Sequence, residues 1–166
     1  FIFVNDNSND GSLELLLNYH NADSNIKIIN MSRRFGVTPC VVAGMKYAKG
    51  DAVVYMDCDL QDPPEMIPKL IEEYKKGADV VHTTRTKRKG ENFFKMQLTK
   101  LAYKVINAVS DIELPENSGD FKLLSRRAVE QLLRLNEYDP FMRGLVRWVG
   151  FKQVNIFYER DPRFAG

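Results

Sequence analysis

Short apolar runs and longer segments of helical periodicity follow one another along this chain. Apolar runs rich in β-branched residues predict strands at residues 1–4, 25–30, 52–56, 78–84 and 151–158. Apolar residues at helical spacing predict helices at residues 13–20, 37–48, 65–76 and 92–110. The segment FKLLSRRAVEQLLRL, which begins at Phe121, predicts one more strand followed by a helix. Strands and helices therefore alternate over most of the chain.

The segment DAVVYMDCDLQDPPE (51–65) combines a buried-strand pattern with closely spaced carboxylates. Asp57, Asp59 and Gln61 follow the predicted strand 52–56 at alternate positions. Ligands bind at the carboxyl ends of strands in an open α/β sheet, and alternate residues of an extended segment point the same way. Mg²⁺ prefers oxygen ligands and often takes only one or two carboxylates, because substrate phosphates supply the rest. The segment therefore predicts a metal-diphosphate site, although a solvated turn or a helix cap is an equally common role for such an acidic pair.

Arg85 and His82 belong to the next predicted strand. Arg85 follows residues 78–84 directly, so it reaches the same edge of the sheet. Its planar guanidinium can bind two oxygens at once, which suits a diphosphate. His82 alternates with apolar neighbours inside the strand, which favours a core or edge residue over a ligand.

Composition leaves room for one domain and argues against nucleic acid as a partner. A chain of 166 residues is long enough for one domain with its own core. The 24 basic and 22 acidic residues give a net charge of +2, so there is no global basic field. No apolar run is long enough to span a bilayer. Cys40 and Cys58 have neither CxxC spacing nor a disulfide-rich context, which favours reduced thiols in the cytosol.

The string DCDLQDPPE resembles the DxD segment of family 2 glycosyltransferases. It is most similar to the branch that transfers a sugar to a polyprenyl phosphate, in which DADLQDPPE is typical and which includes bactoprenol glucosyltransferases and dolichyl-phosphate mannosyltransferases. Other segments resemble the same family in order along the chain. In this chain, NDNSNDGS resembles the family pattern VDDGSxDGT, and MSRRFGVTPCVVAG resembles LSRNFGKxxAxxAG. Further along, GDFKLLSRR resembles GDFRLxxR, and FMRGLVRWVG resembles FxRGLxxWxGF.

The resemblance implies an α/β fold of the GT-A type, the nucleotide-diphospho-sugar transferase fold. Its central sheet is expected to be mostly parallel, Rossmann-like and flanked by helices. Residues 1–166 are expected to form a single GT-A catalytic domain. That domain is expected to be a fragment, with a first strand before Phe1 and a membrane region after Gly166.

The resemblance also implies a set of donor-binding residues. Asp6 occupies the second acidic position of the first motif, where the family binds the nucleotide. Asn5 stands where the first Asp of the family is common, so it can form hydrogen bonds but carries no charge. Arg85 and Arg163 match arginines that contact the donor diphosphate in the family.

The acceptor side of the site is expected around Asp120. An acidic residue at this position acts as general base toward an acceptor hydroxyl in many family 2 enzymes, so Asp120 is a catalytic candidate. A polyprenyl phosphate has a second pKa of about 6 and is mostly a dianion at neutral pH, which leaves positioning of the acceptor as the alternative role of Asp120. Lys122 replaces the Arg that is usual in the family. It keeps the positive charge but lacks the planar guanidinium that can bind two oxygens at once. Lys122 and Arg143 are expected to bind the acceptor, and Trp148 is most simply a core aromatic.

With these residues, the resemblance implies an inverting, metal-dependent hexosyltransferase. The donor is expected to be a nucleotide-diphosphate sugar of the UDP-glucose or GDP-mannose type, and the acceptor a polyprenyl phosphate on the cytoplasmic face of the cell membrane. Mg²⁺ or Mn²⁺ is expected on Asp57, Asp59 and Gln61 and stabilises the diphosphate as leaving group, which makes Asp59 a catalytic candidate beside Asp120.

Two other functions and several partners are compatible with the same residues. One alternative is a family 2 transferase that acts on a sugar hydroxyl of a cell-surface polysaccharide, and the other is a nucleotide-sugar-binding module without turnover. The basic residues between Arg85 and Lys104 favour contact with an anionic membrane surface, although any single lysine among them is more simply a solvated side chain. A homo-oligomer is also compatible with the sequence.

Overall fold

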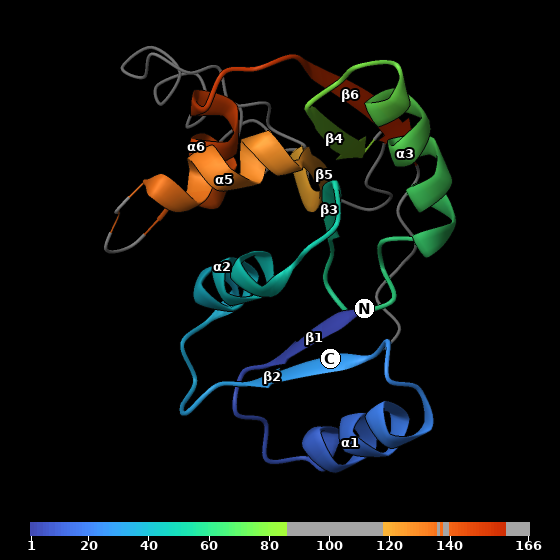
Figure 1. Cartoon of the computed structure of the whole chain (residues 1–166), viewed down its shortest axis with the longest axis vertical. Helices are drawn as coiled ribbons and strands as arrows, with labels where there is room; N and C mark the ends of the chain where they lie inside the picture. The colour runs from blue at the N-terminus through green and yellow to red at the C-terminus, as the bar shows by residue number, and fades with distance from the viewer. Residues whose placement is uncertain (86–117, 136, 138–139, 159–166) are drawn as a thin grey trace, which may run out of the picture. The chain divides into compact units, whose positions relative to one another are not determined.

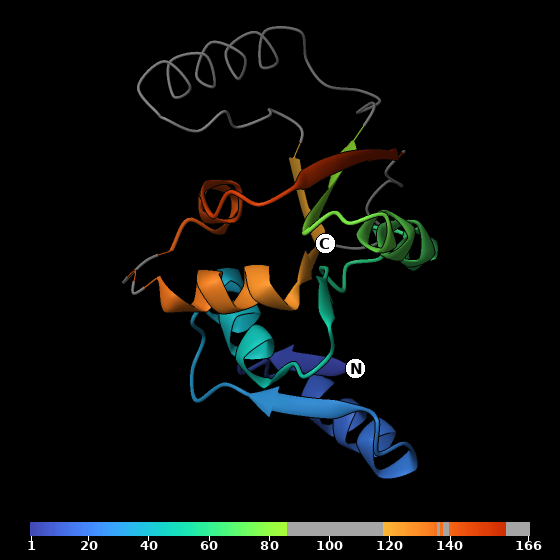
Figure 2. The same cartoon turned by 45° about the horizontal axis from the view of Figure 1, so that its top comes forward.

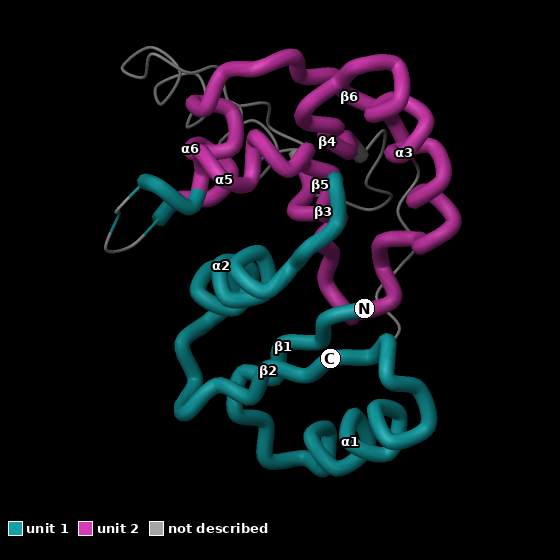
Figure 3. Tube along the Cα trace, in the orientation of Figure 1, with its two compact units in different colours: residues 1–51, 133–140 teal, residues 52–132, 141–166 magenta. Residues whose placement is uncertain are grey.

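The computed structural model describes residues 1–85, 118–135, 137 and 140–158 (Figure 1). The predicted helix at residues 92–110 and the predicted donor-binding residue Arg163 lie outside the described residues. The chain divides into two compact units, which Figure 3 shows in different colours. The first unit comprises Phe1–Asp51 and Leu133–Pro140, and the second comprises Ala52–Leu132 and Phe141–Gly166.

The first unit is built on a pair of parallel strands. Strand β1 (Ile2–Asn5) pairs with β2 (Lys27–Asn30), and helix α1 (Ser12–Ala22) connects them. Helix α2 (Val37–Tyr47) follows β2. Figures 1 and 2 show the strand pair between α1 and α2. The predicted strands and helices of this part of the chain are therefore confirmed, with ends that differ by one to two residues at most positions.

The second unit contains a four-stranded sheet in the order β3-β5-β4-β6. Its strands are β3 (Ala52–Tyr55), β4 (Val80–Arg85), β5 (Ser118–Ser125) and β6 (Gln153–Tyr158). Strand β5 is antiparallel to both of its neighbours, whereas β4 and β6 are parallel. The α/β class with flanking helices is confirmed, but the sheet is mixed rather than mostly parallel, because β5 enters it between β3 and β4 in the opposite direction.

Strand β5 takes the central position because both of its faces are buried. Phe121 and Leu123 point to one face, Lys122 and Leu124 point to the other, and all four are completely buried. An edge strand would leave one face or one row of hydrogen-bonding groups in water. The strand also begins at Ser118, three residues before the strand that the sequence predicts from Phe121.

Helices cover both faces of this sheet. A 3₁₀ turn (Pro64–Met66) leads into α3 (Ile67–Lys75) on one side, and α5 (Arg126–Arg134) and α6 (Met142–Trp148) lie on the other side (Figures 1 and 2). The 3₁₀ turn replaces the first turn of the predicted helix 65–76, where Pro63, Pro64 and Pro68 remove backbone donors. Trp148 lies in α6 but is 58% exposed, so its prediction as a core aromatic is wrong.

The apolar core of the second unit lies between α3 and one face of the sheet. Its buried members are Met66, Leu70, Ala78, Val81, Phe121, Leu123 and Tyr158. Gly77, with a φ of +92°, lets the chain turn from α3 into β4, because glycine adopts this left-handed conformation without steric cost. Gly77 thus links the helix that covers this face to the strand that pairs with β5.

We expect the substitution Leu70→Ala to destabilise the second unit by about 3 kcal/mol, because it leaves a cavity where a completely buried side chain contacts the sheet. The neighbouring residue provides a matched control. Ile71 is 38% exposed, so Ile71→Ala should cost less than about 1 kcal/mol. Chemical denaturation followed by circular dichroism measures both changes. Equal effects of the two substitutions would contradict this description of the core.

Candidate functional site

The strand directions bring the predicted chemistry of the second unit to one edge of its sheet. Strands β3 and β4 are both antiparallel to β5, so they run in the same direction as each other and as β6. The carboxyl ends of β3, β4 and β6 therefore meet the amino end of β5. Asp57 follows β3, Arg85 ends β4, and Asp120 lies near the start of β5. This edge is where an open α/β sheet binds its ligands.

The loop after β3 is bent rather than extended. Strand β3 ends at Tyr55, and Leu60 has a φ of +59°, in the left-handed region. The backbone N–H of Gln61 donates to Asp59 Oδ1 at 3.1 Å, which closes a turn of the kind that aspartate side chains favour. The prediction that Asp57, Asp59 and Gln61 continue the strand in an extended conformation is therefore wrong.

The donor set of this loop fits a hard divalent cation that substrate phosphates help to bind. In the described part of the chain, no group of three or more His, Cys, Asp or Glu residues is arranged to hold a metal ion. Asp57 and Asp59 offer carboxylate oxygens, and Mg²⁺ commonly uses one or two carboxylates together with phosphates. Partial desolvation, followed by the Asp57 and Asp59 carboxylates, raises the pKa of the Cys58 thiol. The raised pKa favours the protonated thiol over the thiolate, which is the form that binds soft metals.

Asp120 is held by the guanidinium of Arg143. Arg143 Nε donates to Asp120 Oδ1 at 2.8 Å, and Nη2 donates to Oδ2. Lys122 Nζ lies 3.9 Å from Asp120 Oδ1. Two parallel hydrogen bonds from one guanidinium are among the strongest pairings available to a carboxylate, and they stabilise its ionised form. The structure thus brings together the three residues that the sequence predicts on the acceptor side.

Lys122 is completely buried in the middle of β5. Its Nζ has no hydrogen-bond partner among the residues that the structure describes. Burial lowers the pKa of Lys122 to about 8, and Asp120 opposes this effect. The Tyr55 ring lies 5.8 Å from Nζ, and the Tyr55 hydroxyl also lacks a partner within the described ranges. Sequence reasoning missed Tyr55, although a residue with a polar tip at the end of an apolar strand is a usable signal.

His82 is a core residue, as its alternating pattern predicted. It is completely buried, and its Nε2 lies 2.7 Å from Gln153 Oε1. Gln153 Nε2 donates to the carbonyl oxygens of Val146, Arg147 and Gly150 at the end of α6, so Oε1 is the acceptor and His82 Nε2 carries the proton. Burial lowers the pKa of His82 to about 4, so the ring is neutral at physiological pH.

The first unit gives Asp6 a local structural role. Its Oδ1 accepts from the Phe35 N–H at 2.7 Å and its Oδ2 from the Gly36 N–H at 2.8 Å. These two bonds lower the pKa of Asp6. Asn5 is buried beside it, donates to Asn30 Oδ1 at 2.7 Å and thereby joins the ends of β1 and β2. Asn5 and Asp6 therefore shape the loop that precedes α2.

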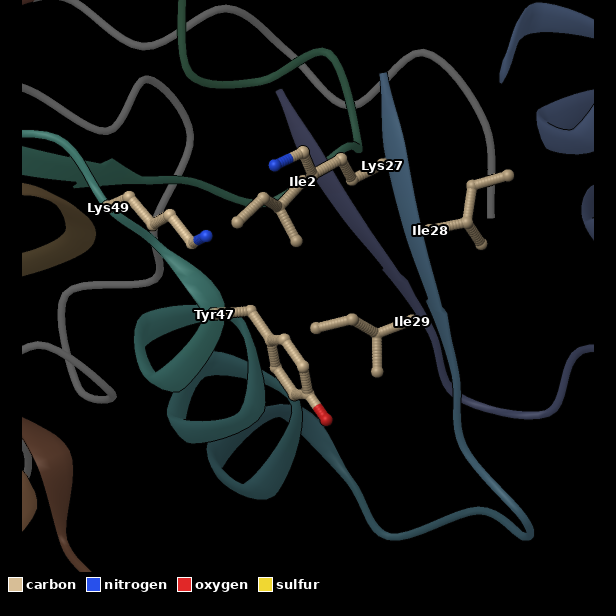
Figure 4. A pocket seen from close by; sticks show the side chains of 6 residues that line it. All are labelled: Ile2, Lys27, Ile28, Ile29, Tyr47 and Lys49. Atoms are coloured by element: carbon tan, nitrogen blue, oxygen red, sulfur yellow. The ribbon is translucent and has the colours of Figure 1, made fainter. Parts of the chain in front are cut away.

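A cavity of about 380 Å³ lies in the first unit, between α2 and the strand pair (Figure 4). Its lining consists of Ile2, Lys27, Ile28, Ile29, Tyr47 and Lys49. No residue that the sequence predicts for the site lines this cavity. Among the described residues, no helix is both long enough and apolar enough to cross a bilayer.

Two solved structures have a similar fold. Glucosyl-3-phosphoglycerate synthase from Mycobacterium tuberculosis, crystallised with Mn²⁺, UDP-glucose and phosphoglyceric acid, has a TM-score of 0.55 at 20% identity over 99% of this chain and 61% of that chain. Residues 1–349 of TarS from S. aureus have a TM-score of 0.58 at 12% identity over 95% of this chain and 50% of that chain. These neighbours are glycosyltransferases of the GT-A fold, and the predicted GT-A fold is confirmed.

Curated relatives match the chain almost from end to end. An uncharacterized glycosyltransferase of Bacillus subtilis, YkcC, is 49% identical over 99% of this chain and 51% of its own length. A prophage bactoprenol glucosyl transferase homolog of Escherichia coli is 38% identical over 99% of this chain and 54% of its own length. The chain thus spans about half the length of the curated relatives that it matches. The family model described as Glycosyl transferase family 2 matches residues 1–133, and the chain belongs to that family.

Proposed function

We propose that this protein is an inverting glycosyltransferase that moves a hexose from a nucleotide-diphosphate sugar to a polyprenyl phosphate. The observation that carries the proposal is the cationic acceptor side, where Arg143 and Lys122 surround Asp120 at the same sheet edge as Asp57. Relatives named as bactoprenol glucosyl transferases, at 38% identity, support a polyprenyl phosphate as the acceptor. The donor is a sugar of the UDP-glucose or GDP-mannose type, and transfer occurs on the cytoplasmic face of the cell membrane.

The donor side of the proposed site consists of Asp57, Asp59 and Gln61. These residues would hold Mg²⁺ or Mn²⁺, which neutralises the donor diphosphate and stabilises it as a leaving group when bound. Crystals of the mycobacterial neighbour that contain Mn²⁺ and UDP-glucose support the use of a divalent metal. Arg85, at the end of β4, shares the negative charge of the diphosphate in this proposal, as does Arg163.

The acceptor chemistry needs an oriented anion rather than a base. A phosphate oxygen of the acceptor attacks the anomeric carbon from the face opposite the diphosphate, a new carbon-oxygen bond forms, and the bond to the diphosphate breaks. A phosphate dianion has no proton to lose, so no residue must accept one. Asp120 holds the Arg143 guanidinium with both carboxylate oxygens, and Arg143 in turn binds and orients the acceptor phosphate.

We expect Asp59→Ala to reduce sugar transfer by about a thousandfold, because stabilisation of the leaving diphosphate supplies several kcal/mol. The test follows labelled nucleotide sugar into a lipid-soluble product in membranes that contain the full-length protein. Glu65→Ala is the matched control, since Glu65 is an exposed carboxylate a few residues along the same segment.

EDTA should abolish transfer, and Mg²⁺ or Mn²⁺ should restore it. Unchanged transfer by Asp59→Ala would contradict the proposal, and saturable donor binding without product would favour the binding-module alternative.

We expect the rate at saturating acceptor to be flat between about pH 6.5 and 8.5, because no proton is removed from a phosphate dianion. Asp120→Asn should lower this rate about tenfold without changing the flat profile, since the amide retains one of the two contacts to Arg143. A sugar hydroxyl as acceptor predicts a different outcome. In that case the rate would depend on the ionisation of Asp120, and Asp120→Asn would remove nearly all activity.

We expect Asp6→Ala to raise the KM for the donor and to accelerate hydrogen exchange at the Phe35 and Gly36 amides, because both amides lose their acceptor. Asp10→Ala is the control, since the Asp10 carboxylate accepts from the backbone N–H and the hydroxyl of Ser12 rather than from the Phe35 and Gly36 amides. Faster exchange with an unchanged donor KM would leave Asp6 with a structural role alone.

A further inference from the structure

The loop after β3 (residues 56–63), here called the β3 loop, is attached to a strand at the opposite side of the sheet. The sheet order is β3-β5-β4-β6, so β3 and β6 lie three strand spacings apart, about 14 Å. Asp62, near the end of the β3 loop, nevertheless accepts a hydrogen bond from the hydroxyl of Tyr158, the last residue of β6. The β3 loop therefore connects the carboxyl ends of two strands that are not neighbours, at the edge of the sheet where Arg85 ends β4.

Both partners of this hydrogen bond are buried. Asp62 is 1% exposed and Tyr158 is 6% exposed. The Tyr158 ring belongs to the apolar core of the second unit and meets the Phe121 ring edge to face, with the ring centroids 6.5 Å apart. Burying a carboxylate is costly unless hydrogen bonds replace its hydration, and apolar side chains of similar size often stabilise a core as well. A buried carboxylate that meets a buried hydroxyl therefore indicates that this contact fixes a particular geometry.

The contact lies directly beside the proposed metal ligands. Gln61 precedes Asp62, and its backbone N–H donates to Asp59 Oδ1 at 3.1 Å. Leu60, between Asp59 and Gln61, has a φ of +59°, a conformation that is uncommon for residues other than glycine. Such residues persist only where the surrounding structure holds them, and they are frequent at ligand-binding sites. The bend at Leu60 is held on one side by β3 and on the other side by Asp62.

Two prolines restrict the backbone that follows Asp62. Pro63 has a φ of −72°, and Pro64 begins the 3₁₀ turn Pro64–Met66, in which the Met66 N–H donates to the Pro63 carbonyl oxygen at 3.1 Å. A proline ring fixes φ, so this part of the chain has little conformational freedom. Met66 is buried in the same apolar core as Tyr158. The end of the β3 loop is therefore held by the side chain of Asp62 and by the turn that follows it.

We propose that Asp62 and Tyr158 are positioning residues, which hold the β3 loop in the conformation that binds the metal and the diphosphate of the donor. This inference rests on the proposed function and deepens it, because it assigns two residues that act through Asp57 and Asp59 rather than on the donor itself. With the hydrogen bond in place, the carboxylates of the β3 loop are preorganised for the cation. Without it, the loop has to be ordered when the donor binds, and this cost lowers the affinity.

Binding of UDP, and of GDP in parallel, to the full-length protein in detergent tests this role without turnover. Tyr158→Phe removes the hydroxyl and keeps the ring that packs on Phe121. We expect this variant to bind the nucleotide about tenfold more weakly in Mn²⁺, since a single hydrogen bond contributes on this scale. Binding in EDTA should be unchanged, because only the metal-dependent part of the affinity depends on the β3 loop. Isothermal titration calorimetry measures both affinities, and hydrogen exchange at the Gln61 amide should be faster in the variant.

Ser125→Ala is the matched control for a loss of stability. Like Tyr158, Ser125 has a buried hydroxyl that donates to a buried aspartate, Asp79, at 2.9 Å, but it ends β5 at the other edge of the same sheet. Ser125→Ala should lower the melting temperature to a similar extent and leave nucleotide binding in Mn²⁺ unchanged. Asp62→Ala should bind as weakly as Tyr158→Phe. Asp62→Asn should bind within about threefold of the unmodified protein, because the amide oxygen still accepts from the Tyr158 hydroxyl.

Three results would overturn the inference. One is metal-dependent binding by Tyr158→Phe that equals that of the unmodified protein, and another is an equal loss in Ser125→Ala, which would make the effect one of general stability. The third is a loss in Asp62→Asn with normal binding by Tyr158→Phe, which would make Asp62 a direct ligand. The transfer assay separates the inference from the proposed function. The expected binding pattern without sugar transfer by the unmodified protein means that the proposed function fails and the positioning role stands, whereas transfer with unchanged metal-dependent binding in Tyr158→Phe means the reverse.

Discussion

The ion pair between Asp120 and Arg143 is the interaction on which the candidate site depends. It joins the amino end of β5 to α6, and it lies beside the buried Lys122. A charge that leaves water is costly unless another charge and hydrogen bonds replace its hydration. Asp120 accepts two hydrogen bonds from Arg143, whereas its Oδ1 lies 3.9 Å from Lys122 Nζ. The two cations therefore differ, because Arg143 donates hydrogen bonds to Asp120 whereas Lys122 lies only within ion-pair distance of it.

Alternate side chains of β5 lie on opposite faces of the sheet, one of which belongs to the apolar core while the other carries polar residues. Phe121 and Leu123 pack on the face that α3 covers, and they belong to the apolar core of the second unit. Lys122, between them, points to the opposite face, which carries Tyr55 and His82. Because side chains of a strand alternate between faces, one strand can contribute to a core and to a polar site without mixing the two. The same burial that stabilises β5 also desolvates Lys122 and lowers its pKa.

In the proposed function, the donor side needs few protein ligands for its cation. The described part of the chain has no cluster of three metal-binding side chains, and a cation shared with a substrate diphosphate does not need one. The loop after β3 instead supplies two carboxylates, Asp57 and Asp59, on a bend that the Gln61 N–H closes. The neighbours of known structure are at most 20% identical among those compared above, so the arrangement of the strands is what they share with this chain.

The sequence by itself determined most of the strands and helices of the described residues, the family and the motifs of the site, because these depend on local periodicity and on residues adjacent in the chain. Tertiary structure alone decided the central, antiparallel position of β5, since strand order depends on pairing between residues far apart. It also decided that Trp148 is exposed and that Arg143 meets Asp120, 23 positions away. The sequence analysis did not single out Tyr55, because its position opposite Lys122 depends on the pairing of β3 with β5. Local sequence reports what each segment can form, whereas burial and charge compensation depend on which segments the fold brings together.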